Sequence, residues 1–140
     1  MSSYPKIIAV DFDGCLCENK WPEIGNPNWG TINELIRRKA EGDKVILWTC
    51  RADKMLEEAI LWCYNRGLKF DAINDNLPEN KEHFGNNCRK VFANEYWDDR
   101  AVPVIAGYPL AGHIIVFNKK EEQRKRLFEN LRKVIKKWQK

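Results

Sequence analysis

Two aspartates follow directly on an apolar run near the start of the chain. Residues 7–18 read IIAVDFDGCLCE, so a strand-like stretch ends at Asp11 and Asp13. An unpaired charge is costly inside a buried strand, and acids placed here are therefore expected at a strand end. Side chains alternate along an extended segment, so we expect both carboxylates on one side and Phe12 pointing toward the core. Gly14 has the backbone freedom to turn the chain away from them.

Other polar residues border predicted strands in the same way. Thr49 directly follows one apolar run, Asp98 and Asp99 directly follow another, and Lys90 lies just ahead of that second run. In open α/β sheets, ligands bind outside the carboxyl ends of the strands. We therefore expect these side chains to converge with Asp11 at one edge of a sheet.

Carboxylates gathered at one edge repel each other and require a cation. Hard oxygen ligands with room for water suit Mg²⁺, while Lys90 adds a fixed positive charge and Thr49 a hydroxyl donor. Phosphoryl transfer through an aspartyl-phosphate needs these groups, because an anionic nucleophile can approach only when the phosphoryl oxygens are neutralised. In this hypothesis Asp11 attacks phosphorus. Asp13 protonates the leaving alkoxide and later deprotonates the attacking water.

The elements that must position these residues alternate as in an α/β fold with a largely parallel sheet. A helix is predicted over residues 30–42, with a capping-box pattern of Thr31 and Glu34. A second helix is predicted to begin with Asp53 as its N-cap and to be stopped by Gly67. The predicted strands cover residues 6–10, 44–48, 70–73, 93–97 and 113–117, and the first of them is a continuous run typical of a strand covered on both faces.

Four motifs resemble those of the haloacid dehalogenase-like (HAD) superfamily, in that family's order. They are DFDGCL at 11–16, Thr49 in ILWTCR, Lys90 in CRKVFA and EYWDDRA at 95–101. More narrowly, the chain resembles the short HAD hydrolases of bacteria and their phages that have no cap domain. The resemblance implies a Rossmann-like parallel sheet sandwiched by helices, which is a HAD-like core without a cap.

The same resemblance implies roles for single residues. It makes Asp11 the nucleophile and Asp13 the general acid/base, and it makes the enzyme a phosphatase that acts on phosphomonoesters. Thr49 and Lys90 would hold the phosphoryl group. The implied Mg²⁺ ligands are Asp11, the backbone carbonyl of Asp13, and Asp98, Asp99 or both.

Two assignments stay open. Lys81, in the loop where many relatives carry their lysine, is the alternative to Lys90, which we favour because it directly precedes the acid-bearing strand. Arg51 lies two residues past Thr49 and is a candidate for substrate binding, with an ordinary surface position as the alternative.

The segments where HAD relatives insert a cap domain, 15–29 and 74–89, are too short to fold into one. The first has room for a small flap around residues 18–29, and the second reads as a loop with one turn of helix. Such an open site cannot exclude water by closing its own lid. We expect it to be covered by a large phosphorylated substrate (a small molecule or a nucleic-acid end) or by a second subunit of a homo-oligomer.

Bulk properties fit one domain over residues 1–140, with 44% hydrophobic and 31% charged residues. No apolar run is long enough for a membrane span. The five cysteines are odd in number and scattered, which favours reduced thiols and a cytoplasmic protein. Residues 119–140 carry ten Lys/Arg and three Glu, a net charge of +7, and predict a basic amphipathic helix at about 120–138. We expect it to dock on its own sheet, with oligomer or nucleic-acid contacts as alternatives.

Two other functions compete with the phosphatase hypothesis. A receiver-like signalling domain also uses acids, Thr, Lys and Mg²⁺, but its phosphoacceptor normally stands alone at the end of a middle strand, with paired acids at the first strand. This chain has the D-x-D pair first and Asp98-Asp99 last, which favours the hydrolase. A catalytically idle nucleic-acid-binding protein would use the basic tail, and the intact acid set argues against it.

Overall fold

The fold was analysed in a computed structural model, and the structure describes residues 4–105, 108–109 and 121–138. The chain divides into two compact units, residues 1–99 and 100–140, and each is described by itself. All the predicted site residues belong to the first unit. The strand predicted at 113–117 lies outside the described residues, and the single-domain organisation stays a prediction.

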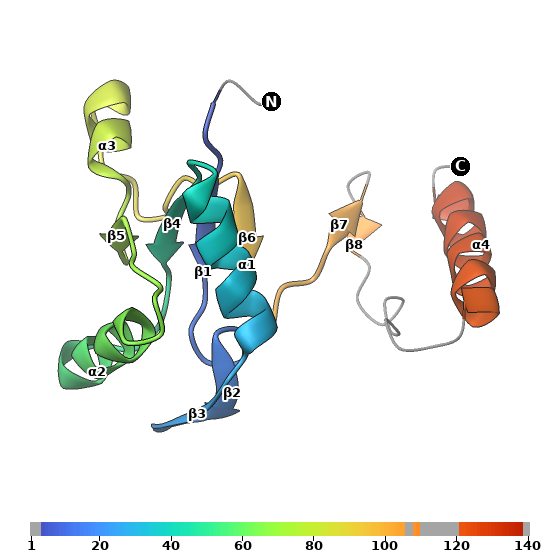
Figure 1. Cartoon of the computed structure of the whole chain (residues 1–140). Coiled ribbons are helices and arrows are strands. Elements are labelled where there is room, and N and C mark those ends of the chain that lie inside the picture. The colour runs from blue at the N-terminus through green and yellow to red at the C-terminus, as the bar shows by residue number, and fades with distance from the viewer. Residues whose placement is uncertain (1–3, 106–107, 110–120, 139–140) are drawn as a thin grey trace. The chain divides into compact units, whose positions relative to one another are not determined.

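The first unit is built on a four-stranded sheet in the order β5-β4-β1-β6 (Figure 1). All three strand pairs are parallel, so the predicted α/β class with a parallel sheet flanked by helices is confirmed. The topology is compatible with a Rossmann-like fold. Each strand is one or two residues shorter than predicted, and the strands are β1 (Ile7–Val10), β4 (Lys44–Leu47), β5 (Ala72–Ile73) and β6 (Glu95–Trp97).

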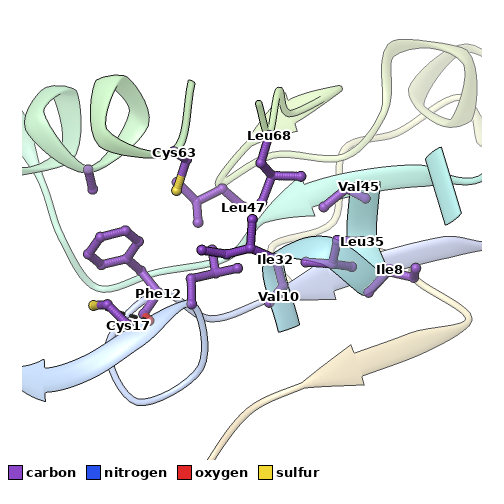
Figure 2. Close-up of a cluster of buried hydrophobic side chains, with 12 residues drawn as sticks. Ile8, Val10, Phe12, Cys17, Ile32, Leu35, Val45, Leu47, Cys63 and Leu68 are labelled. Atoms are coloured by element: carbon purple, nitrogen blue, oxygen red, sulfur yellow. Dashed lines mark hydrogen bonds between the residues drawn. The ribbon is translucent and has the colours of Figure 1, made fainter. Parts of the chain in front are cut away.

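One face of this sheet is covered by the helices α1 (Trp29–Ala40) and α2 (Asp53–Tyr64). Side chains that alternate along β1 and β4 meet apolar side chains of both helices, and Figure 2 shows them interdigitating. On the opposite face, residues that flank α3 (Pro78–Phe84) bury a smaller cluster. The first cluster contains Ile8, Val10, Val45, Leu47, Ile32, Leu35 and Cys63, and the second contains Ile7, Ala9, Ile46, Leu77 and Val91.

Both predicted helix caps are wrong, and at α1 the N-cap residue is held by contacts with the turn that follows β1. The N-cap of α1 is Asn28 rather than the Thr31 capping box, and its side chain makes no capping hydrogen bond. Instead, Asn28 donates its amide to the carbonyl of Leu16 and its Nδ2 to the carbonyl of Cys15. The N-cap of α2 is the extended residue Ala52, and Asp53 is the first helical residue.

The two short insertions form small elements, as expected. Residues 17–27 form an antiparallel hairpin of β2 (Cys17–Lys20) and β3 (Glu23–Pro27), which we call the flap. The turn of helix expected within 74–89 is α3, which ends at Gly85 in a left-handed conformation with φ of 71°. Neither segment folds into a cap domain.

The second unit contains a short antiparallel pair, β7 (Val104–Ile105) with β8 (Tyr108–Pro109), and the helix α4 (Glu121–Trp138). The helix predicted at about 120–138 is thereby confirmed. Among its described side chains, Leu131, Val134 and Ile135 are half-buried, while the basic residues between them are exposed. In the described part of the chain, no helix combines the length and the apolar character needed to cross a bilayer.

Candidate functional site

Asp11 and Asp13 leave the carboxyl end of β1, the strand that lies between β4 and β6. The amide of Asp11 donates to the carbonyl of Trp97, the last residue of β6, at 2.9 Å. Phe12 is completely buried and meets Trp62 of α2 edge to face, with ring centroids 5.5 Å apart. The predicted alternation is therefore present, because Phe12 anchors the segment in the core while the flanking acids remain partly accessible.

Gly14 allows the side chain of Asp99 to lie against the backbone that follows the two acids. Gly14 has φ of +85°, and a Cβ built on it would lie 2.6 Å from Cγ of Asp99. A side chain at this position would therefore collide with the Asp99 carboxylate. One ligand atom each from Asp11, Cys15 and Asp99 lies within 4.8 Å of the others. The structure thus brings the first and last predicted acids together.

The electrostatics of Asp11 reflect this crowding. Burial raises the pKa of Asp11 to about 6, the negative charges of Asp98, Asp99 and Asp13 push it in the same direction, and a hydrogen bond from the amide of Phe12 opposes them. A carboxylate with this pKa is mostly ionised at neutral pH, but its charge is poorly compensated by protein groups. The predicted cluster of like charges is therefore real in the fold.

Cys15 is a member of this cluster that the sequence reasoning did not assign to it. Its thiol is 3.6 Å from the carbonyl of Trp97. Burial raises the pKa of Cys15 to about 11, and the nearby charge of Asp11 adds to this effect. The thiol therefore stays protonated near neutral pH. The sequence signal was its place in the turn after the D-x-D pair, four residues from Asp11.

Arg51 is the residue whose position differs most from the sequence analysis. Its side chain is completely buried and forms an ion pair with Asp13, with Nε to Oδ2 at 2.9 Å and Nη2 to Oδ1 at 2.8 Å. The surface position considered above is wrong. Because the guanidinium has no exposed surface in this arrangement, we do not carry Arg51 forward as a substrate-binding residue.

Thr49 follows β4 and is fixed by contacts on both sides. Its amide donates to Oδ1 of Asn74 at 2.8 Å, and its Oγ1 accepts a hydrogen bond from the amide of Arg51 at 3.1 Å. Asn74 follows β5 in a left-handed conformation and also donates its amide to the carbonyl of Leu47. Asn74 therefore ties the loop after β4 to the loop after β5, which holds Thr49 at the carboxyl edge of the sheet.

The choice between the two lysines stays open. Nζ of Lys90 lies over the ring of Tyr96, 5.3 Å from its centroid. Nζ of Lys81 forms an ion pair with Asp75 at 2.8 Å, and Asp75 also accepts a hydrogen bond from Asn87. To bind phosphate, Lys81 would have to break its ion pair with Asp75, whereas Lys90 would lose only its contact with the exposed ring of Tyr96. This difference favours Lys90, as the sequence position did.

One solved structure is similar to the chain over most of its length. It is described as the structure of a conserved protein from Bacteroides thetaiotaomicron, and it shares 41% sequence identity with this chain at a TM-score of 0.63. The match covers 71% of this chain and 79% of that one. No protein-family model matches the chain, and neither does any curated protein.

The close approach of Asp99 to Gly14 predicts that Gly14→Ala destabilises the fold more than an alanine at an open glycine. A left-handed backbone costs an alanine about 1–2 kcal/mol, and at Gly14 the new Cβ also forces the exposed Asp99 carboxylate to move away, which adds a smaller cost than a clash with backbone would. Gly42→Ala is the matched control, because Gly42 has φ of +106° and an added Cβ would meet nothing within 4 Å. Urea unfolding of both variants measures the difference, and equal losses would contradict this placement of Asp99.

The raised pKa of Asp11 predicts a pH-dependent effect of Asp11→Asn. The folded protein holds the Asp11 proton up to about pH 6, whereas the unfolded chain releases it near the ordinary value of 3.8. The stability that Asp11 contributes is thus fully present below 3.8 and is lost as the pH rises through about 6. We expect Asp11→Asn to raise the free energy of unfolding at pH 8, without divalent cations, and to change it little at pH 4.

Asp43→Asn is the control of opposite sign for this measurement. Burial raises the pKa of Asp43, but the hydrogen bonds from Arg38 and from the amide of Lys6, together with the positive charges of both residues, outweigh it, so the pKa lies below its ordinary value. Its substitution should lower the free energy of unfolding at pH 8. A loss of stability in Asp11→Asn at pH 8, like that in Asp43→Asn, would contradict the uncompensated charge at Asp11.

Proposed function

The chain belongs to the same family as this conserved protein of Bacteroides thetaiotaomicron, and we propose that it is a Mg²⁺-dependent phosphatase with a HAD-like core. It hydrolyses a phosphomonoester through an aspartyl-phosphate on Asp11. The proposal rests on the half-buried Asp11. Its carboxylate lies at the same sheet edge as that of Asp99, and the charges of Asp98 and Asp13 add to the rise of its pKa. Such poorly compensated charge favours a cation and an electrophilic substrate over a purely structural role.

The donor set at this edge fits Mg²⁺. Carboxylate oxygens of Asp11 and Asp99 lie close enough together to share one ion, and oxygen ligands are those that Mg²⁺ prefers. Asp98 and the backbone carbonyl of Asp13 are the further ligands that we propose. The Cys15 thiol, with its pKa near 11, is a poor ligand at neutral pH. Bound Mg²⁺ would supply positive charge to the phosphoryl oxygens and to the crowded carboxylates.

Asp11 and Asp13 have different roles in the two proposed steps. In the first, an oxygen of ionised Asp11 forms a bond to phosphorus as the bond to the leaving oxygen breaks. The leaving oxygen takes a proton from Asp13, which gains that proton from solvent when the charge of the bound phosphate opposes its ionisation. In the second, Asp13 takes a proton from water, whose oxygen attacks phosphorus and releases Asp11 and phosphate. The Thr49 hydroxyl and the Lys90 ammonium hold the phosphoryl oxygens during both steps.

The proposed substrate follows from the open edge. The flap and α3 are too small to enclose a ligand, so the substrate is a phosphorylated small molecule or nucleic-acid end large enough to shield the site, or a second copy completes the cover. All five cysteines lie in the described residues, and each is a free thiol. Free thiols support the proposed cytoplasmic location.

Asp11→Asn is expected to abolish Mg²⁺-dependent hydrolysis of an aryl phosphate, because an amide cannot act as the nucleophile. The loss should be on the order of a thousandfold or more. Asp43→Asn is the matched control, since Asp43 precedes β4 at the opposite edge of the sheet and accepts a hydrogen bond from the amide of Lys6. Equal rates for the wild-type protein and Asp11→Asn would remove the nucleophile assignment.

Asp13→Asn is expected to reduce turnover to a small residual rate while leaving Asp11 able to react. With a good leaving group, phosphorylation of Asp11 needs little acid catalysis, whereas hydrolysis of the aspartyl-phosphate needs a base. Labelled acetyl phosphate should therefore give a phosphoprotein that persists longer in Asp13→Asn than in the wild type. Unchanged turnover would refute the role of Asp13, and an equally long-lived label on the wild-type protein would favour the receiver-like alternative.

A further inference from the structure

Arg51 is a charged side chain in the interior whose hydrogen bonds join three separate parts of the first unit. Besides its two bonds to Asp13, Nη1 donates to the carbonyl of Pro22 at 3.2 Å, and Nη2 donates to the carbonyl of Glu23 at 2.9 Å. Its own amide donates to Oγ1 of Thr49. One residue therefore connects the D-x-D segment, the turn of the flap and the loop after β4.

Two aromatic rings hold the guanidinium in this position. Its Cζ lies 5.0 Å from the centroid of Phe12 and 5.1 Å from that of Trp21. Phe12 is completely buried, whereas Trp21 belongs to the flap turn and is 55% exposed. Cation–π contacts of this kind stabilise a guanidinium that has left water. The guanidinium is therefore fixed by the core on one side and by the flap on the other.

The contacts of Arg51 constrain Asp13 closely. A bidentate pair with a planar guanidinium fixes both the position and the plane of a carboxylate. The Asp13 side chain is 16% exposed, so one part of it remains open to solvent. Because the same guanidinium holds the flap turn, a displacement of the turn changes the contacts that orient Asp13.

We infer that Arg51 is the positioning residue that holds Asp13 and the flap turn as one unit. The inference rests on the phosphatase function proposed above for its catalytic consequence, but not for the structural connection itself. Arg51 acts through Asp13 and does not touch the substrate. Its loss should therefore affect the steps in which Asp13 moves a proton, and it should release the flap turn.

A double-mutant cycle in the full chain tests the catalytic half. Arg51→Met should lower kcat for phenyl phosphate by about a hundredfold, the effect of misplacing a catalytic group by about 1 Å. In an Asp13→Asn background the same substitution should change the residual rate less than about twofold, because the residue it positions is already inactive. A further hundredfold loss in that background would overturn the inference, since Arg51 would then act independently of Asp13.

Arg38→Met is the matched control for this cycle. Arg38 is also mostly buried and also makes a two-pronged contact with a carboxylate, that of Glu95, with a further bond to Asp43. These partners lie at the beginnings of β4 and β6, away from the site. Its substitution should destabilise the fold but leave kcat unchanged in both backgrounds. A hundredfold fall of kcat in Arg38→Met would mean that any lost buried arginine has this effect, which would overturn the assignment.

If Arg51→Met does not fold, Arg51→Lys provides a second test of the same inference. Lysine retains the positive charge but not the planar fork, so it should restore part of the lost kcat. Circular dichroism and urea unfolding establish that the variants are folded. A lysine variant that is folded and has wild-type kcat for phenyl phosphate would show that the bidentate geometry is unimportant.

Limited proteolysis tests the structural half without any need for activity. Lys20 is exposed and ends β2 immediately before the flap turn. Trypsin should release the fragment of residues 1–20 at least several times faster from Arg51→Met than from Arg38→Met or the wild type. An unchanged rate would overturn the connection between Arg51 and the flap. If instead the wild type shows no Asp11-dependent hydrolysis, the proposed function fails while the proteolysis still decides this connection.

Discussion

Repulsion between carboxylates at the end of β1 is the constraint on which the rest of the site depends. The sheet order places β1 between β4 and β6, so the parallel strands deliver their following loops to one edge. Asp11, Asp13, Asp98 and Asp99 are gathered there. Burial is the main cause of the raised pKa of Asp11, and the charges of the other three aspartates add to it. Each local feature of this edge either relieves the repulsion or allows it to persist.

Gly14 allows the charges to stay close together, whereas Arg51 compensates one of them. Gly14 has no side chain, and this allows the Asp99 carboxylate to approach the backbone next to Asp11, which keeps the charges close. Arg51 compensates the charge of Asp13 with two hydrogen bonds. Asp11 therefore carries the less compensated charge, while Asp13 carries the better compensated one. Two aspartates separated by a single residue thus have different environments, which agrees with the two different roles that we propose for them.

The sequence predicted the parts of this arrangement that depend on local pattern. Four of the predicted strands are present in one parallel sheet, and the alternation around Phe12 placed Asp11 at the strand end. What it could not predict are features set by contacts between distant segments. Arg51 is buried because Asp13 and two flap carbonyls surround it. The cap of α1 is Asn28, and not Thr31, because Asn28 is tied to the turn that follows β1. The HAD-like core and the magnesium site stay predictions.

The Arg51–Asp13 pair is better explained by positioning than by stability. Moving two charges out of water costs several kcal/mol per ion, and replacing such a pair by apolar residues is often neutral or stabilising. The ion pair is therefore weak evidence for a stabilising role. The pair instead orients a carboxylate and holds the turn of the flap, which apolar residues cannot do. In a chain whose insertions are too short for a cap domain, this arrangement links the turn of the flap to Asp13, the residue for which we propose an acid/base role.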